Sequence, residues 1–297
     1  FERNPEAKPL HSDFTAPSAW RAKQTEQRKP TSFIAAETVA QTLHGYEKNN
    51  LYLFLHSKFG AEEALRLMKD YRVGTSKHWP GSCVFWQTDI NGSVRTGKVM
   101  LYDADSGKRV KHPFNHVTWV HSLLKLPEFN LRQCFFGEHL LPMNRGKPVA
   151  IVESEKTALV AAYYLPEYVW LASGGKNGCF NSDALCVLRG RQVILYPDIG
   201  ATDQWRQKLS LLCNLGIEAS IFNYLEEVAT DDERKAGLDI ADYLLQIEPD
   251  QAVLQTMIRR NPMLQKLIDD LQLTLVSVER YNPDTDAINK TSTPPKQ

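Results

Sequence analysis

The stretch Pro148-Val-Ala-Ile-Val-Glu153-Ser-Glu155-Lys156-Thr-Ala-Leu-Val decides the fold of this chain. Its apolar run ends on a carboxylate and leads into a helix-like segment, the pattern of a buried strand followed by a helix. A second run, Arg191-Gln-Val-Ile-Leu-Tyr-Pro-Asp198, has the same pattern. Because the carboxyl ends of neighbouring parallel strands share one edge of a sheet, where ligands collect, we expect Glu153 and Asp198 to face one crevice.

Two carboxylates at one sheet edge favour a hard cation such as Mg²⁺ or Mn²⁺, which binds oxygen ligands and keeps several waters. Such a pair indicates phosphate chemistry or phosphate binding. A second interpretation of Glu153 stays open, since an acid at a helix N-terminus stabilises the helix without any catalytic purpose. Glu155 and Lys156 also have a second interpretation: they can be ordinary residues of the first helical turn.

Strands and helices alternate after Gly146. We predict strands at 148–153, 168–172, 192–197 and 217–223, with helices near 155–164, 181–188 and 202–215. This alternation predicts an α/β fold in which helices cover both faces of a parallel sheet.

The preceding region has the pattern of a β-hairpin. Apolar runs on either side of Asn91-Gly92 predict two strands, since this dipeptide suits the positive φ angles of a tight turn. A further short strand is expected at 108–110. Helices are expected over 33–47, around 51–55 and from Gly60 to about Tyr71. We therefore expect a smaller α+β subdomain with an antiparallel sheet before the parallel one.

The chain divides into five predicted parts. These are a flexible linker at 1–30, the α+β subdomain at 31–146, the α/β domain at 147–247, a helical segment at 248–281 and a disordered tail at 282–297.

The composition is that of an ordinary globular protein, with 297 residues, 42% hydrophobic, and 35 basic residues against 35 acidic ones. The balance excludes a globally basic nucleic-acid binder. The charges are unevenly distributed, however: residues 70–133 carry nine Lys or Arg against five acids, and residues 218–248 carry nine acids against Arg234 and Lys235. Such asymmetry fits a polar substrate path, and it also fits a solvated face.

The five cysteines form no CxxC pair and no Cys/His cluster with zinc spacing, which favours reduced thiols in an intracellular protein. The chain has no apolar run of about 18 residues and no signal-like start, so we expect a cytoplasmic protein with no membrane partner. The chain begins at Phe1, which leaves room for an upstream module such as a zinc-binding one.

Two motifs resemble those of Toprim domains. Glu153-Ser-Glu-Lys-Thr-Ala is similar to the first, in which a glutamate ends the first strand, and Tyr196-Pro-Asp198-Ile-Gly200 is similar to the second, usually Asp-x-Asp. The approach through Gln133-Cys-Phe-Phe-Gly137 resembles the passage into the Toprim core of bacterial DNA primases. The resemblance covers roughly residues 75–245 and implies a Toprim-like sheet with a basic subdomain before it.

The second motif is degenerate, because Gly200 stands where the family has its second acid. The metal ligands implied by the resemblance are Glu153, Asp198, Asp203 and Asp239. Asp203 would substitute for the missing acid directly or through water, yet it suits a helix start equally well. Asp239 resembles the acidic helix start after the Toprim core of primases, and it also suits a helix N-cap.

A glycine-rich segment, Ser173-Gly-Gly-Lys-Asn-Gly178, follows the second predicted strand and precedes a helix. Glycines let backbone N–H groups approach an anion, and a helix N-terminus adds positive potential. The spacing is not that of a Walker P-loop, and a simple turn is the alternative. The candidate phosphate- or nucleotide-binding residues are Lys156, Gly174, Gly175 and Lys176.

The antiparallel region combines cations with an aromatic side chain, which fits a groove that follows a single strand of nucleic acid. A sheet edge protected by lysines has a similar composition. The candidate nucleic-acid-binding residues are Lys77, Trp79, Arg95, Lys98, Lys108, Arg109 and Lys111.

The resemblance implies a primase-like Toprim protein that binds single-stranded DNA and Mg²⁺ or Mn²⁺. If active, it would be a nucleotidyltransferase in the DNA replication of a mobile element, with Glu153 and Asp198 as catalytic residues. Implied partners are nucleotides and a replication helicase or other mobile-element protein. Two alternatives stay open: a non-catalytic, degenerate Toprim module that binds DNA or protein, favoured by Gly200, and a Toprim nuclease.

Overall fold

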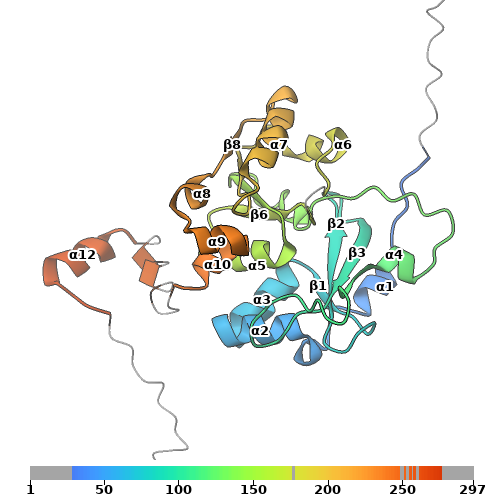
Figure 1. Ribbon diagram of the computed structural model, residues 1–297, viewed down its shortest axis with the longest axis horizontal. Coiled ribbons are helices and arrows are strands. Elements are labelled where there is room, and N and C mark those ends of the chain that lie inside the picture. The colour runs from blue at the N-terminus through green and yellow to red at the C-terminus, as the bar shows by residue number, and fades with distance from the viewer. Residues whose placement is uncertain are drawn as a thin grey trace, which may run out of the picture.

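The computed structural model describes residues 29–175, 178–247, 251, 254–255, 257–258 and 261–275. Figure 1 shows an antiparallel sheet and a parallel sheet next to each other, with helices around both. Apart from residues 29 and 30, the predicted linker at 1–30 lies outside the described residues, as does the whole predicted tail at 282–297. The predicted domain boundaries stay a prediction.

The antiparallel sheet has the order β1-β2-β3-β4 and confirms the predicted α+β region. Its strands are β1 (Val73–Thr75), β2 (Cys83–Thr88), β3 (Val94–Met100) and β4 (Val117–Trp119). The helices of this region are α1 (Ala36–Ala40), a 3₁₀ turn (Tyr46–Lys48), α2 (Asn50–Phe59), α3 (Ala61–Asp70) and α4 (Val120–Leu123).

The predicted β2–β3 hairpin is confirmed. The Asp89 carboxylate accepts hydrogen bonds from the backbone N–H groups of Asn91 (3.0 Å) and Ser93 (2.9 Å), which holds the chain in the turn. Gly92 has φ +84°, a left-handed conformation in which glycine has no steric cost.

The helix predicted over 33–47 is wrong in extent, because α1 covers only Ala36–Ala40. The Thr42 hydroxyl donates to the Val39 carbonyl (2.7 Å), and Gly45 adopts φ +68°, so the backbone leaves the helix within two turns. The strand predicted at 108–110 is only an isolated bridge between Tyr102 and Arg109.

The parallel sheet has the order β6-β5-β7-β8, and every neighbouring pair is parallel. Its strands are β5 (Val149–Val152), β6 (Val169–Ala172), β7 (Val193–Leu195) and β8 (Ala219–Ile221). All four lie within the ranges that the apolar runs predict. The predicted α/β fold class is therefore confirmed.

Helices cover both faces of this sheet, as the alternation of side chains along β5 requires. Ala150 and Val152 belong to the same core as α5 (Glu155–Tyr164) and α10 (Ile240–Leu244). Val149 and Ile151 belong to a second core with α6 (Ser182–Leu185), the 3₁₀ turn Cys186–Leu188 and α7 (Thr202–Asn214).

Two short helices, α8 (Tyr224–Val228) and α9 (Asp231–Ala236), follow β8 and were not predicted. Their acidic segment has no apolar periodicity, although the Thr230–Glu233 capping box of α9 is visible in the sequence. Helix α12 (Met263–Leu271) falls inside the helical segment predicted at 248–281. Much of the rest of that segment lies outside the described residues.

One hydrophobic core runs between the two sheets. It includes side chains of α2, α3 and β2 together with those of β5, α5 and β6. The Tyr71 hydroxyl donates to the Trp170 carbonyl at 3.1 Å, and a Cβ on Gly137 would lie 2.9 Å from that same oxygen. Gly137 also has φ +86°, so glycine is required where the chain passes from one sheet to the other.

The five cysteines are free, and Cys83, Cys134 and Cys179 are buried. Nowhere in the described part of the chain is there a helix with the length and apolar character needed to cross a bilayer.

Candidate metal and phosphate site

The sheet topology brings Glu153 and Asp198 to one edge. Strands β5 and β7 are hydrogen-bonded neighbours, with Ile151 opposite Leu195. Glu153 comes directly after β5, and Asp198 follows β7 through Tyr196 and Pro197. Parallel neighbours end on the same side of a sheet, so both acids lie at the carboxyl edge.

A cavity of about 470 Å³ opens at this edge, and we call it the carboxylate pocket. Its acidic lining residues are Glu153, Glu155, Asp198, Asp239 and Asp242. Its basic lining residues are Lys98, Lys108, Arg109, Lys111 and Lys156. The acids come from the parallel sheet and the segments after it, whereas four of the five cations come from β3 and the loop after it.

The carboxylates of the pocket disfavour one another's charge. Burial, together with the negative charges of Asp239, Glu153 and Asp242, raises the pKa of Asp198 to about 7. Burial also raises the pKa of Asp239, and Asp242 acts in the same direction. A bound cation would relieve this repulsion, because an opposite charge within a few ångströms favours the ionised form of a carboxyl group.

Asp239 is the N-cap residue of α10. Its Oδ1 accepts hydrogen bonds from the backbone N–H groups of Ala241 (2.8 Å) and Asp242 (3.2 Å), and the Asp242 carboxylate accepts from the Asp239 N–H in return. The Thr157 hydroxyl donates to Oδ2 of Asp239 at 2.5 Å. The capping alternative is therefore observed, and one oxygen of Asp239 is already engaged by α5.

Lys98 and Glu155 form a buried ion pair between the two sheets. The Lys98 ammonium lies 3.1 and 3.2 Å from the Glu155 carboxylate oxygens and 3.0 Å from the Gly174 carbonyl. Only 11% of the Lys98 side chain and 2% of the Glu155 side chain are exposed. Lys98 thus holds β3 against α5 and the glycine loop, which leaves it less free for nucleic acid than an exposed lysine.

The glycine segment lies beside the pocket at the carboxyl end of β6. Gly174 and Gly175 both have positive φ, at +81° and +138°, and Gly175 lines the pocket. Lys176, the cation predicted in this segment, lies outside the described residues. Lys156 also lines the pocket, and its ammonium donates to the Gly107 carbonyl at 3.1 Å.

The structure does not bring Asp203 into the pocket. Its side chain is 94% exposed and pairs with Arg206 at 3.0 Å on the surface of α7. At Gly200, where the resemblance predicts a second acid, the backbone N–H donates to Glu226 at 2.7 Å, and the Thr202 hydroxyl donates to the same oxygen at 3.2 Å. Glu226 therefore accepts hydrogen bonds from two polar groups at the start of α7.

The predicted nucleic-acid-binding residues do not form a single surface. Lys108, Arg109 and Lys111 line the carboxylate pocket. Lys77 lines a smaller cavity, where Trp86 also lies. Trp79 contacts the rings of three neighbouring aromatic residues instead, and Arg95 lies in another cavity.

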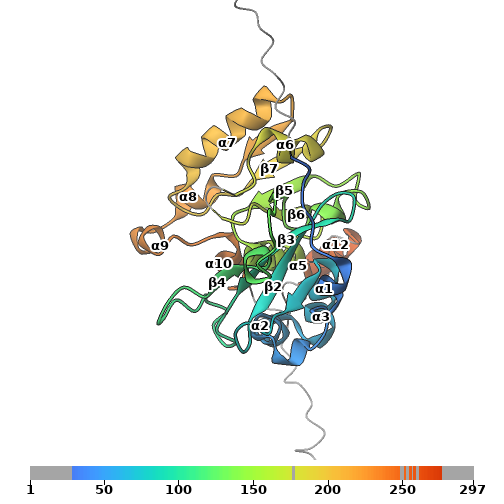
Figure 2. The same ribbon diagram turned by 90° about the vertical axis from the view of Figure 1, so that its right-hand side faces the viewer.

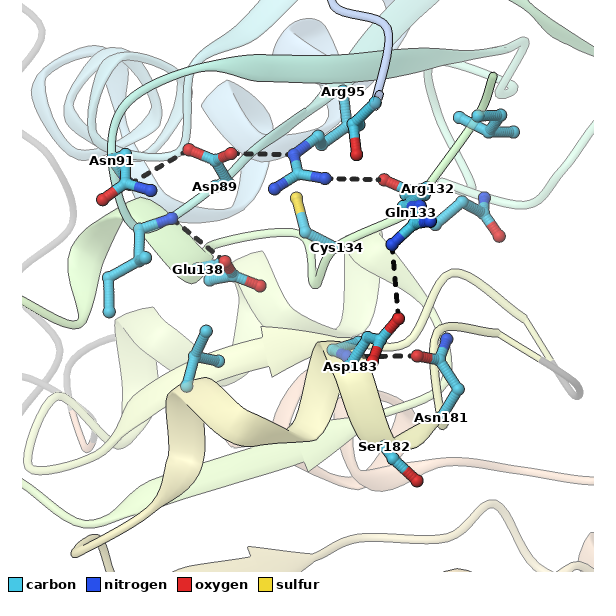
Figure 3. Close-up of a pocket in the computed structure, with 15 residues that line it drawn as sticks. Asp89, Asn91, Arg95, Arg132, Gln133, Cys134, Glu138, Asn181, Ser182 and Asp183 are labelled. Atoms are coloured by element: carbon cyan, nitrogen blue, oxygen red, sulfur yellow. Dashed lines mark hydrogen bonds and ion pairs between the residues drawn. The ribbon is translucent and has the colours of Figure 1, made fainter. Parts of the chain in front are cut away.

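That other cavity, of about 780 Å³, lies between the β2–β3 turn and α6 (Figure 3). It is larger than the carboxylate pocket, but its charged groups already have partners. Arg95 pairs with Asp89 at 2.7 Å, and Arg132 pairs with Asp183 at 3.4 Å. Glu138 accepts two backbone hydrogen bonds. Because these charged groups already pair within the protein, they are less available to bind a ligand than those of the carboxylate pocket.

The oxygen donors of the carboxylate pocket fit a divalent cation in kind. Across the described ranges, no three His, Cys, Asp or Glu side chains are arranged to hold a metal ion. Mg²⁺ commonly binds through one or two carboxylates and fills its other positions with water and phosphate oxygens. Glu153 and Asp198 meet that smaller requirement.

Lys208 of α7 is a charged residue near these carboxylates that the sequence did not reveal. Its ammonium is buried 3.8 Å from the centroid of the Trp205 ring, and no described group accepts a hydrogen bond from it. Burial lowers the pKa of Lys208, whereas Glu153 and Asp198 act in the opposite direction. The sequence around Lys208 does not indicate that it is buried, because a lysine on an amphipathic helix normally faces solvent.

The chain belongs to the family described as "Domain of unknown function (DUF6371)", which matches residues 49–199. The match covers the antiparallel sheet and strands β5, β6 and β7 of the parallel sheet, and it ends one residue after Asp198. No curated protein matches this chain.

The fold is similar to that of bacterial primase cores. The RNA polymerase domain of Mycobacterium tuberculosis primase DnaG aligns with a TM-score of 0.47 and 13% identity over 73% of this chain and 79% of that chain. The same domain in complex with double-stranded DNA aligns with a TM-score of 0.46 and 14% identity over 76% of this chain and 78% of that chain. The primase fragment of the Bacteriophage T7 primase-helicase protein aligns with a TM-score of 0.36 and 16% identity over 58% of this chain and 70% of that chain. These similarities concern the fold alone.

Proposed function

We propose that the carboxylate pocket binds a divalent cation together with phosphate groups, and that the chain is a primase-like Toprim protein that transfers nucleotides on single-stranded DNA. One observation carries the proposal. A single cavity joins acidic side chains at the carboxyl edge of the parallel sheet with basic side chains from the antiparallel-sheet region. Phosphoryl transfer needs both kinds of side chain, because carboxylates bind the metal ion and Lys or Arg side chains bind the phosphates.

Glu153 and Asp198 would hold Mg²⁺ or Mn²⁺, since their carboxylates lie at adjacent strand ends. Asp239 would contribute the oxygen that Thr157 now engages. When bound, the cation supplies electrostatic stabilisation of the attacking and leaving oxygens. The absence of an acid at Gly200 leaves fewer protein ligands than an Asp-x-Asp motif would provide.

Arg109 and Lys111 would bind phosphates from the opposite wall of the pocket. A guanidinium group binds a phosphate through two parallel hydrogen bonds, whereas an ammonium acts as a compact charge. Lys156 and Gly175 would orient the phosphate nearest the carboxylates, because they line the same pocket as Glu153 and Asp198. Lys98 would act indirectly by fixing the glycine loop through Gly174.

A template-dependent assay tests the proposal. Purified protein is incubated with single-stranded DNA, labelled nucleotides and Mn²⁺ or Mg²⁺, and extension products are measured. We expect Glu153→Gln and Asp198→Asn each to reduce product at least about 100-fold, the scale for loss of a group that stabilises transition-state charge. The matched control is Asp203→Asn, which removes an exposed acid outside the pocket and should leave the rate unchanged.

Absence of extension by the folded wild type, with the cation bound, would contradict nucleotidyl transfer. That result would identify a non-catalytic module that binds DNA or protein, the alternative that Gly200 favours. Cleavage of labelled DNA in place of extension would instead identify a nuclease. A role in mobile-element replication and a helicase partner stay predictions of the resemblance.

A further inference from the structure

Four aromatic rings gather in the antiparallel-sheet region. Phe114 and His116 are stacked with centroids 4.3 Å apart, and Trp79 lies 5.1 Å from His116 and 6.3 Å from Phe114. His78 contacts the outer side of Trp79 at 4.3 Å. We call Trp79, Phe114 and His116 the aromatic platform.

The platform is held in place by the protein and remains partly exposed to solvent. Trp79 packs against the core that contains Val84 and Val99, and the His116 ring shares a hydrogen bond with the Val110 carbonyl (3.2 Å). Phe114 nevertheless remains 52% exposed. A large apolar ring that is held in place but half exposed has area available for a flat partner.

One loop links the platform to the carboxylate pocket. Lys111 and His112 line the pocket, and Phe114 and His116 follow them in the same loop between β3 and β4. Figure 2 shows this loop extending away from the two sheets. Phe114 is therefore only three residues from Lys111, which lines the pocket.

Charge around the platform favours an anionic partner. Residues 71–88 and 106–127, which supply all three platform residues, contain no Asp or Glu. They do contain Lys77, Lys108, Arg109 and Lys111. Aromatic faces bordered by cations are the features with which proteins bind unpaired nucleotides, since bases stack on rings while phosphates contact Lys and Arg.

We infer that the aromatic platform stacks unpaired bases of single-stranded DNA and guides that strand to the phosphate-binding wall of the carboxylate pocket. The inference rests on the proposed function and deepens it, because it assigns binding roles to Phe114 and His116. Duplex DNA does not offer free base faces, so the platform selects single strands. A stabilising aromatic cluster would show the same ring contacts without discriminating between oligomers with and without bases.

Fluorescence anisotropy with three labelled oligomers tests the inference. These are a thymidine 12-mer, an abasic sugar-phosphate oligomer of the same length, and a duplex. We expect Phe114→Ala to weaken binding of the thymidine oligomer about tenfold, the scale for one stacked base, and to leave the abasic oligomer unchanged. Phe114→Trp should restore the affinity. The salt dependence should not change, since stacking releases no counterions.

Two variants serve as controls. Lys111→Ala should weaken binding of the thymidine and abasic oligomers equally and reduce the salt dependence of that binding, because it removes a phosphate contact. Phe33→Ala removes a ring of similar exposure, 48%, that packs against Arg95 instead of the platform, and it should bind all oligomers as the wild type does.

Equal binding of the thymidine oligomer by Phe114→Ala and the wild type would overturn the inference, as would equal losses for thymidine and abasic oligomers. Mn²⁺ titration of the same proteins separates this result from the proposed function. Mn²⁺ bound at the carboxylate pocket with no effect of Phe114→Ala contradicts the platform alone. Base-dependent binding without Mn²⁺ binding contradicts the metal site alone.

Discussion

Glu138 is a carboxyl group that is buried between the two sheets. Only 2% of the residue is exposed, and its two oxygens accept hydrogen bonds from the backbone N–H groups of Ile90 (3.0 Å) and Phe135 (3.2 Å). Burial raises the pKa of Glu138 to about 7, although both hydrogen bonds act to lower it. Desolvation therefore outweighs hydrogen bonding at this position.

Stability should fall with rising pH because of this group. Its folded-state pKa of about 7 lies above the ordinary value of 4.5, so its stabilising contribution is fully present below pH 4.5 and is lost as the pH rises through about 7. The loss is on the order of 3 kcal/mol. We expect the free energy of unfolding of the wild type to fall by that amount relative to Glu138→Gln between pH 4.5 and 7.5, measured by urea unfolding.

The exposed Glu62 of α3 gives a matched control, because Glu62→Gln changes a solvated carboxylate. Its unfolding free energy should follow that of the wild type across the same range. Parallel curves for Glu138→Gln and the wild type would contradict the burial effect. Neither Glu138 nor Lys208 was predictable, because the sequence around them does not reveal that tertiary packing buries their charges.

Single elements explain which parts of the fold were predictable. The strands β5 to β8 and helices α5 and α7 follow apolar runs and amphipathic patterns, so local sequence determines them. Helix α1 ends early because Thr42 and Gly45 favour turn conformations, which the apolar pattern over 33–47 did not indicate. Helices α8 and α9 lack an apolar stripe, and only α9 has a capping box, formed by Thr230 and Glu233.

At α10, the cap and the charge of Asp239 can be separated. Asp239→Ala removes the acceptor for two backbone N–H groups and should cost about 1–2 kcal/mol of unfolding free energy. Asp239→Asn keeps an acceptor oxygen and should cost less than about 0.5 kcal/mol. Thermal or urea unfolding measures both. Equal destabilisation by the two variants would show that the charge, and not the cap, stabilises α10.

The whole molecule forms its pocket from two regions that are far apart in sequence. The sequence motifs placed Glu153 and Asp198 at one edge, because parallel topology follows from the alternation of elements. They did not indicate that Lys108, Arg109 and Lys111 line the same pocket as these acids, or that Lys77, Trp79 and Arg95 do not line it. The Lys98–Glu155 pair joins the antiparallel sheet to α5, and no local sequence pattern reveals this contact.

The most direct test of the account is a titration with Mn²⁺, followed by electron paramagnetic resonance, of the wild type, Asp198→Asn, Glu153→Gln and the surface control Asp203→Asn. If Glu153 and Asp198 bind the cation, the wild type and Asp203→Asn should bind Mn²⁺ alike, and each pocket variant should bind it at least about tenfold more weakly, since each loses one carboxylate ligand. A wild type that binds no Mn²⁺, or an Asp198→Asn variant with unchanged affinity, would show that these carboxylates do not form a metal site.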